Sequence, residues 1–69
     1  MTRRELEDKY FENGLRINSL VRLSEQTDPF SAEFERILSE IQRLRSENWN
    51  IWRRIFELSG AEIAERMQG

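Results

Sequence analysis

The chain has 69 residues, of which 38% are hydrophobic and 35% are charged, and its formal net charge is -2. A chain this short forms one domain at most and buries only about 60% of the surface that its unfolded form exposes, so it needs additional stabilisation. Because it contains neither cysteine nor histidine, disulfides and the commonest metal ligands are excluded, which leaves association with another chain.

The composition also argues against several classes of function. Thirteen acidic residues against eleven basic ones disfavour a nucleic-acid-binding chain, which normally has a basic excess or patch. Catalysis by a Ser-His-Asp set or by cysteine is not available, so we expect no enzyme, no cofactor and no small-molecule substrate. No apolar run approaches the roughly 18 residues of a membrane span, and no apolar stretch follows Arg4 to form a signal peptide, so we expect a cytoplasmic protein.

A first helix is predicted over about residues 3–25. Thr2 and Glu5 have the spacing of a capping box at its start. One face at helical spacing then consists of Leu6, Tyr10, Ile17, Leu20 and Val21. Gly14 lies at the edge of this face, where the missing side chain would let another helix approach. The alternative is a β-hairpin turning at Asn13-Gly14, but a lone hairpin is barely stable in water, so we favour the helix.

A second, longer helix is predicted over about residues 29–58. Asp28 can accept hydrogen bonds from free amides at its start, and Pro29 suits its first turn. Apolar positions then alternate spacings of four and three residues, which is the pattern of a coiled coil. This seam consists of Phe34, Ile37, Ile41, Leu44, Asn48, Ile51, Ile55 and Leu58, with Phe30 one turn before it. Gly60 suits a helix end, so we expect a separate short helical segment over about 60–67, or a longer helix that contains Gly60.

The second helix carries more apolar surface than one seam requires. An additional aromatic stripe consists of Leu38, Trp49, Trp52, Phe56 and Ile63, roughly 90° around the helix from the seam. One facing helix covers a stripe about 100° wide, so the first helix cannot cover both. Because soluble monomers avoid large exposed apolar patches, we predict that the stripe is an interface, either for a second copy or for another protein.

Asn48 is a polar residue among the isoleucines and leucines of the seam. Such a residue costs stability but can determine register or oligomeric state. Asn13 lies on the apolar face of the first helix, and a hairpin that turns near Thr27 would place Asn48 near the start of that helix. We therefore expect that any contact between the two asparagines crosses between chains.

Four arginines lie close together in the second helix: Arg43, Arg45, Arg53 and Arg54. Glutamates alternate with them at the spacing of helical neighbours, which favours surface ion pairs over a phosphate-binding patch.

Together these patterns predict an all-α antiparallel helical hairpin, which assembles as a homodimeric four-helix bundle. We expect a small non-catalytic protein–protein interaction module, acting as a regulator, adaptor or assembly component through helix packing. One alternative is a nucleic-acid-binding regulator, either a plasmid-type hairpin or a truncated helix-turn-helix, since residues 58–67 are similar to the opening helix of that motif. Another is a filament or secretion-apparatus subunit, because Asp28-Pro29 and the long second helix resemble type III secretion needle subunits in outline.

Overall fold

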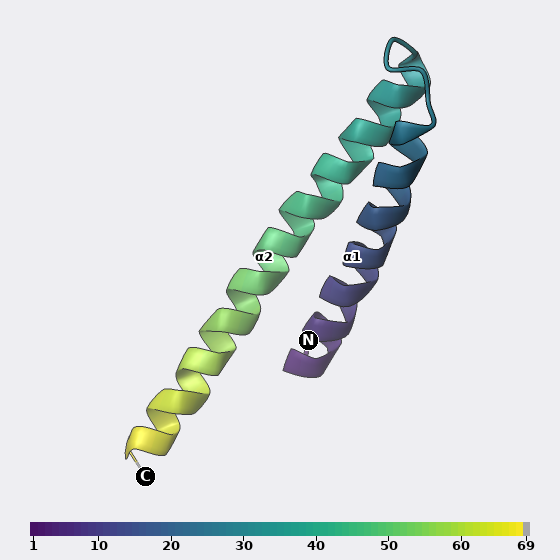
Figure 1. Cartoon of the computed structure of the whole chain (residues 1–69). Coiled ribbons are helices and arrows are strands. Elements are labelled where there is room, and N and C mark those ends of the chain that lie inside the picture. The colour runs from purple at the N-terminus through teal and green to yellow at the C-terminus, as the bar shows by residue number, and fades with distance from the viewer. Residues whose placement is uncertain (69) are drawn as a thin grey trace.

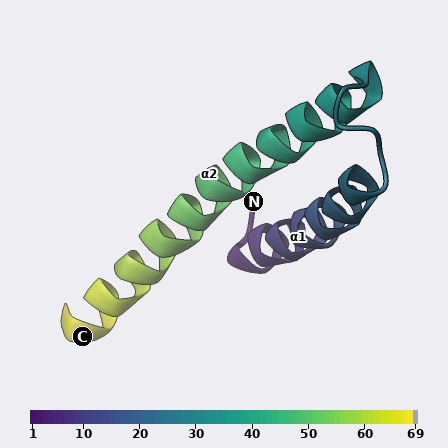
Figure 2. The same ribbon diagram turned by 45° about the horizontal axis from the view of Figure 1, so that its top comes forward.

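The computed structural model describes residues 1–68 and consists of two helices joined by a short connection. Helix α1 spans Arg3–Glu25 and helix α2 spans Ala32–Gln68. The two helices run antiparallel along each other, and α2 continues past the N-terminal end of α1 (Figures 1 and 2). No strand occurs in the described residues, which confirms the all-α hairpin. The alternative turn at Asn13-Gly14 is wrong, because both residues lie within α1.

Side chains near both ends of α1 satisfy backbone groups that the helix leaves unpaired. The hydroxyl of Thr2 accepts from the amide of Glu5 at 3.2 Å and donates to the Glu5 carboxylate at 3.1 Å. Thr2 is therefore the N-cap, although Glu5 bonds the Thr2 hydroxyl where a full capping box would use the Thr2 amide. At the other end the hydroxyl of Thr27 donates to the carbonyl oxygen of Leu23 at 2.7 Å.

Helix α2 begins at Ala32, so the prediction of a start near residue 29 is wrong. The Asp28 carboxylate accepts from the amide of Phe30 at 3.0 Å, and the Asp28 carbonyl accepts from the amide of Ser31 at 3.1 Å. These bonds form a turn, after which the Ser31 hydroxyl accepts from a backbone amide of the first helical turn at 3.1 Å, as an N-cap does. Phe30 consequently lies in the turn before the helix, where it is 95% exposed.

Helix α2 is continuous through Gly60. No residue among 1–68 has a positive φ, so Gly60 does not adopt the left-handed conformation of a helix cap. The predicted separate segment over residues 60–67 is therefore wrong. Glycine inside a helix costs about 1 kcal/mol relative to alanine, a cost that need not end a helix. The Arg3 guanidinium contacts the Glu62 carboxylate at 2.7 Å, and beyond this ion pair α2 projects past α1 (Figure 1).

The core is a single row of side chains between the two helices. Its buried apolar members are Leu6, Ile37, Ile41, Leu44 and Ile51. The other seam positions of α2 are buried or half-buried, so every predicted seam residue is at least partly covered. On α1, Ile17, Leu20 and Val21 are half-buried, whereas Tyr10 lies at the edge with 41% of its surface exposed.

The hairpin is a thin rod with more apolar surface than it can bury. Its principal extents are 58 × 17 × 14 Å and its radius of gyration is 16.6 Å. A compact domain of this length would have a radius of gyration of about 11 Å. Large hydrophobic side chains that are exposed outnumber those that are buried. No helix within residues 1–68 is long and apolar enough to cross a membrane.

Candidate interaction site

One side of the hairpin is closed by ion pairs between the helices. Lys9 contacts Glu47 at 3.8 Å and Arg16 contacts Glu40 at 4.0 Å. Arg43 joins the two carboxylates, with its Nε 3.0 Å from Glu40 Oε2 and its Nη1 3.4 Å from Glu47 Oε2. We refer to these five residues as the charged cluster. Because their side chains are partly exposed, the cluster contributes little stability but presents a polar surface to solvent.

The ion-pair prediction for the arginines of α2 is confirmed for two of them. Arg43 belongs to the charged cluster, and Arg54 contacts Glu57 at 3.6 Å. Arg45 and Arg53 form no ion pair within residues 1–68.

The charged cluster shifts the pKa of one of its carboxyl groups, that of Glu40. A hydrogen bond from the Arg43 guanidinium lowers the pKa of the Glu40 carboxyl below its ordinary value, and the charges of Arg43 and Arg16 act in the same direction. Because this pKa is lower in the folded chain, the ion pair stabilises the fold above the ordinary carboxyl pKa. That stability is lost as the pH falls through the folded pKa. Arg43→Gln should therefore raise the pKa of Glu40, as measured by an NMR titration of its carboxyl carbon.

Arg54→Gln is the matched control, because Arg54 pairs with Glu57 and not with Glu40. It should leave the Glu40 titration unchanged. An unchanged Glu40 pKa in Arg43→Gln would show that the ion pair does not persist in solution.

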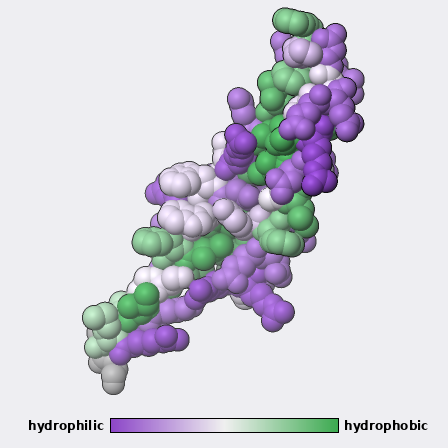
Figure 3. Space-filling view, viewed as in Figure 1, coloured by the Kyte–Doolittle hydropathy of each residue, from purple (hydrophilic) through white to green (hydrophobic). Residues whose placement is uncertain are grey.

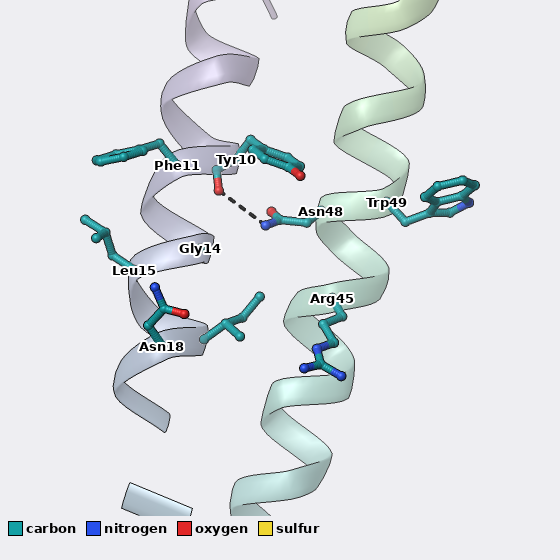
Figure 4. Close-up of a pocket in the computed structure, with 9 residues that line it drawn as sticks. Tyr10, Phe11, Gly14, Leu15, Asn18, Arg45, Asn48 and Trp49 are labelled. Atoms are coloured by element: carbon teal, nitrogen blue, oxygen red, sulfur yellow. Dashed lines mark hydrogen bonds between the residues drawn. The ribbon is translucent and has the colours of Figure 1, made fainter. Parts of the chain in front are cut away.

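The other side of the hairpin contains an open groove of about 520 Å³ between α1 and α2. Its lining consists of Tyr10, Phe11, Gly14, Leu15, Ile17, Asn18, Arg45, Asn48 and Trp49. We call Phe11 and Leu15 on α1 and Trp49 on α2 the two rims, because they belong to the lining and each points away from the opposite helix (Figure 4). Gly14 and Asn48 lie between the rims. The groove thus has apolar rims and a floor between the helices.

Two residues determine the character of the groove floor. A Cβ atom added at Gly14 would meet no atom of α2 within 4 Å, so α2 does not approach closely there and the space stays open. The side-chain amide of Asn48 donates to the carbonyl oxygen of Tyr10 at 3.2 Å (Figure 4). Its Oδ1 atom is buried and has no hydrogen-bond partner within residues 1–68. A buried polar atom without a partner costs free energy.

Asn13 and Asn48 lie at neighbouring levels of the same hairpin. Asn48 bonds Tyr10, and the Asn13 amide donates at 3.3 Å to Glu47, the residue next to Asn48. The prediction that Asn48 lies near the start of α1 is wrong, because the connection occupies residues 26–31 and the midpoint of the hairpin lies beyond Thr27. That any direct contact between the two asparagines crosses between chains stays a prediction.

The aromatic stripe of α2 is uncovered by α1. Trp49 is 59%, Trp52 44% and Phe56 66% exposed. Their rings stack in succession, with centroids 5.5 Å apart in both pairs. Leu38 and Ile63, the outer members of the stripe, are exposed as well. The stripe residues thus lie where the sequence predicts an uncovered surface, and their role as an interface stays a prediction.

Two apolar residues of α1, which were not predicted as part of an interface, extend this surface. Phe11 is 66% exposed and Leu15 is 54% exposed, and together with Trp49 they line the groove. The signal in the sequence was an apolar pair four residues apart outside the predicted core face. We define the apolar face as these two residues together with the aromatic stripe. Figure 3 shows apolar and aromatic side chains gathered over both helices, with hydrophilic ones around them.

The size of the apolar face is that of a protein interface. Taking roughly 100 Å² for each half-exposed large side chain, its seven residues expose about 700 Å². The largest apolar patch on a soluble monomer is typically about 300–600 Å², and a standard interface buries about 800 Å² on each partner. Fold and site together define a two-helix hairpin with one ion-paired side and one exposed apolar face. Comparison with known protein families, curated proteins and solved structures found no match for this chain.

Proposed function

We propose that this chain is a small non-catalytic protein–protein interaction module, a regulator, adaptor or assembly component that acts by packing its apolar face against other helices. The observation that carries this proposal is the exposed stack of Trp49, Trp52 and Phe56 beside an open interhelical groove. Tryptophan is enriched among the residues that dominate binding energy at protein interfaces.

A second copy of the chain is the simplest partner, and the product would be a homodimeric four-helix bundle. Two arguments support self-association. A single row of core residues provides little burial for a 69-residue chain, and the chain has no cysteine for a disulfide. Two hairpins packed face to face would cover both apolar faces and create a second core layer.

Light scattering across a concentration series tests the assembly. We expect a mass of twice the chain mass of 8.4 kDa at micromolar concentrations. Leu38→Glu should raise the dimer dissociation constant at least tenfold, which corresponds to about 1.4 kcal/mol, because it places a carboxylate in the apolar interface.

Leu23→Glu is a closely matched control. Leu23 is 44% exposed and Leu38 is 40% exposed, but Leu23 follows Arg16 by seven residues and so lies on the side of the charged cluster. It should leave the dissociation constant unchanged. A helical monomer at every concentration would exclude the homodimer. Equal effects of the two variants would show that the apolar face is not the interface.

A further inference from the structure

The five residues of the aromatic stripe and Arg45 lie along one face of α2, with a spacing that is the same in both directions. Leu38, Arg45, Trp49, Trp52, Phe56 and Ile63 are separated by seven, four, three, four and seven residues. In a twofold interface each contact occurs twice, so that residue i meets residue j and residue j meets residue i. If two α2 helices pack antiparallel with the twofold axis between Trp49 and Trp52, each of these six residues lies opposite another of the six in the second copy.

This register places a particular side chain over the groove. Leu38 lies opposite Ile63 of the second copy, and Trp49 lies opposite Trp52. Arg45 then lies opposite Phe56 of the second copy. Because Arg45 and Trp49 are part of the groove lining, Phe56 of the second copy is brought to the mouth of the groove.

We propose that two copies pair through antiparallel α2 helices and that Phe56 of each copy inserts into the groove of the other, an inference that rests on the proposed self-association. Phe56 is 66% exposed in its own chain, so it is free to enter a partner. Gly14 leaves the groove floor open, with no atom of α2 within 4 Å of an added Cβ. Phe11 and Trp49 supply apolar rims for the incoming ring (Figure 4).

Arg45 gives the groove a group that suits an aromatic ring. It lies on the same side of α2 as the aromatic stripe and forms no ion pair within residues 1–68. A guanidinium within about 6 Å of a ring centroid is attracted to the face of the ring. Insertion of Phe56 from the second copy therefore provides Arg45 with an interaction that its own hairpin lacks.

Two further observations favour a second copy as the occupant. Ile63 follows Glu62, where α1 makes its ion pair with α2, and Ile63 is 56% exposed; the proposed register covers it with Leu38 of the second copy. The exposed area of the apolar face, about 700 Å², is also close to the roughly 800 Å² that each partner buries in a stable interface.

A double-mutant cycle on the dimer dissociation constant tests the insertion. Gly14→Leu fills the groove floor and Phe56→Ala removes the inserted ring, so each should raise the constant at least tenfold. In the double variant the added leucine occupies part of the space of the lost ring. The increase in the dissociation constant of the double variant should therefore be well below the product of the two single increases. Ser19→Leu, which adds the same side chain at an exposed position of α1 outside the groove lining, should leave the constant unchanged. Circular dichroism of each variant verifies that the helices are retained.

Spin labels test the register independently of the mutations. Since the chain has no cysteine, Glu35→Cys and Arg53→Cys each provide a single labelling position. With a rise of about 1.5 Å per residue, the proposed register separates the two copies of the label along the axis by about 7 Å at residue 53 and about 46 Å at residue 35. The distance measured by double electron–electron resonance should therefore be about 30 Å longer for the residue-35 label.

The outcomes separate this inference from the proposed function. A dimer in which both labels give similar distances, or in which the Gly14 and Phe56 effects multiply independently, overturns the inference and leaves self-association intact. A chain that stays monomeric overturns both. A dimer with the expected difference in distance and coupled effects supports the exchange of Phe56.

Discussion

Replacing Leu44 with alanine is expected to lower the free energy of unfolding by about 3 kcal/mol. Leu44 is the least exposed of the core residues, at 2%, and lies in the middle of the seam. The loss includes the transfer free energy of the removed atoms and the cost of the cavity that they leave. Domains of this size have total stabilities of roughly 3–10 kcal/mol, so the variant should be close to unfolding at 25 °C. Urea titration monitored by circular dichroism, at one protein concentration, measures the change.

Leu23→Ala is the control for this prediction. The same atoms are removed, but Leu23 is 44% exposed, so the expected change lies within about 0.5 kcal/mol. Similar losses in the two variants would contradict the assignment of the seam as the core of the hairpin.

Replacing Asn48 with leucine is expected to raise the free energy of unfolding by about 1–2 kcal/mol. The substitution removes a buried Oδ1 atom that has no hydrogen-bond partner within residues 1–68 and replaces it with an apolar group of similar shape. The hydrogen bond to the Tyr10 carbonyl is lost as well, but a carbonyl inside a helix keeps its bond to the amide four residues on. Thermal and urea unfolding measure the gain.

Asn13→Leu is the matched control for Asn48. Asn13 is also buried, at 6% exposed, but its amide donates to Glu47 and it leaves no buried polar atom without a partner. We expect a smaller gain or a loss. A decrease in stability for Asn48→Leu would mean that the amide of Asn48 makes a stronger contact than its hydrogen bond to Tyr10.

The two sides of the hairpin differ in the way that the proposed interaction module would require. The charged cluster joins α1 to α2 on one side and keeps that surface polar. The apolar face on the other side leaves Trp49, Trp52 and Phe56 exposed. Because charge on one side disfavours apolar contact, association would be directed to the groove side, and the hairpin would pair in one orientation instead of aggregating from both sides.

The seam of α2 could be predicted from the sequence because it depends only on helical periodicity. Spacings of four and three residues place Ile37, Ile41 and Leu44 on one side of any α-helix, whatever covers them. Helical periodicity also predicted that the stripe around Trp52 lies on a different side of α2 from the seam. The start of α1 could be predicted for a similar reason, because it depends only on Thr2 and the residues of the first helical turn.

The tertiary structure alone decided how the two helices face each other. Hydrogen bonds around Asp28 and Ser31 form a turn, so α2 begins at Ala32 and not near residue 29. The position of this turn determines that Asn48 lies opposite Tyr10. The position of the turn, together with the rotation of α1 about its own axis, brought Phe11 and Trp49 to the two rims of one groove. Periodicity assigns a residue to a side of its own helix, but the groove depends on the relative placement of two helices, which is a non-local property of the folded chain.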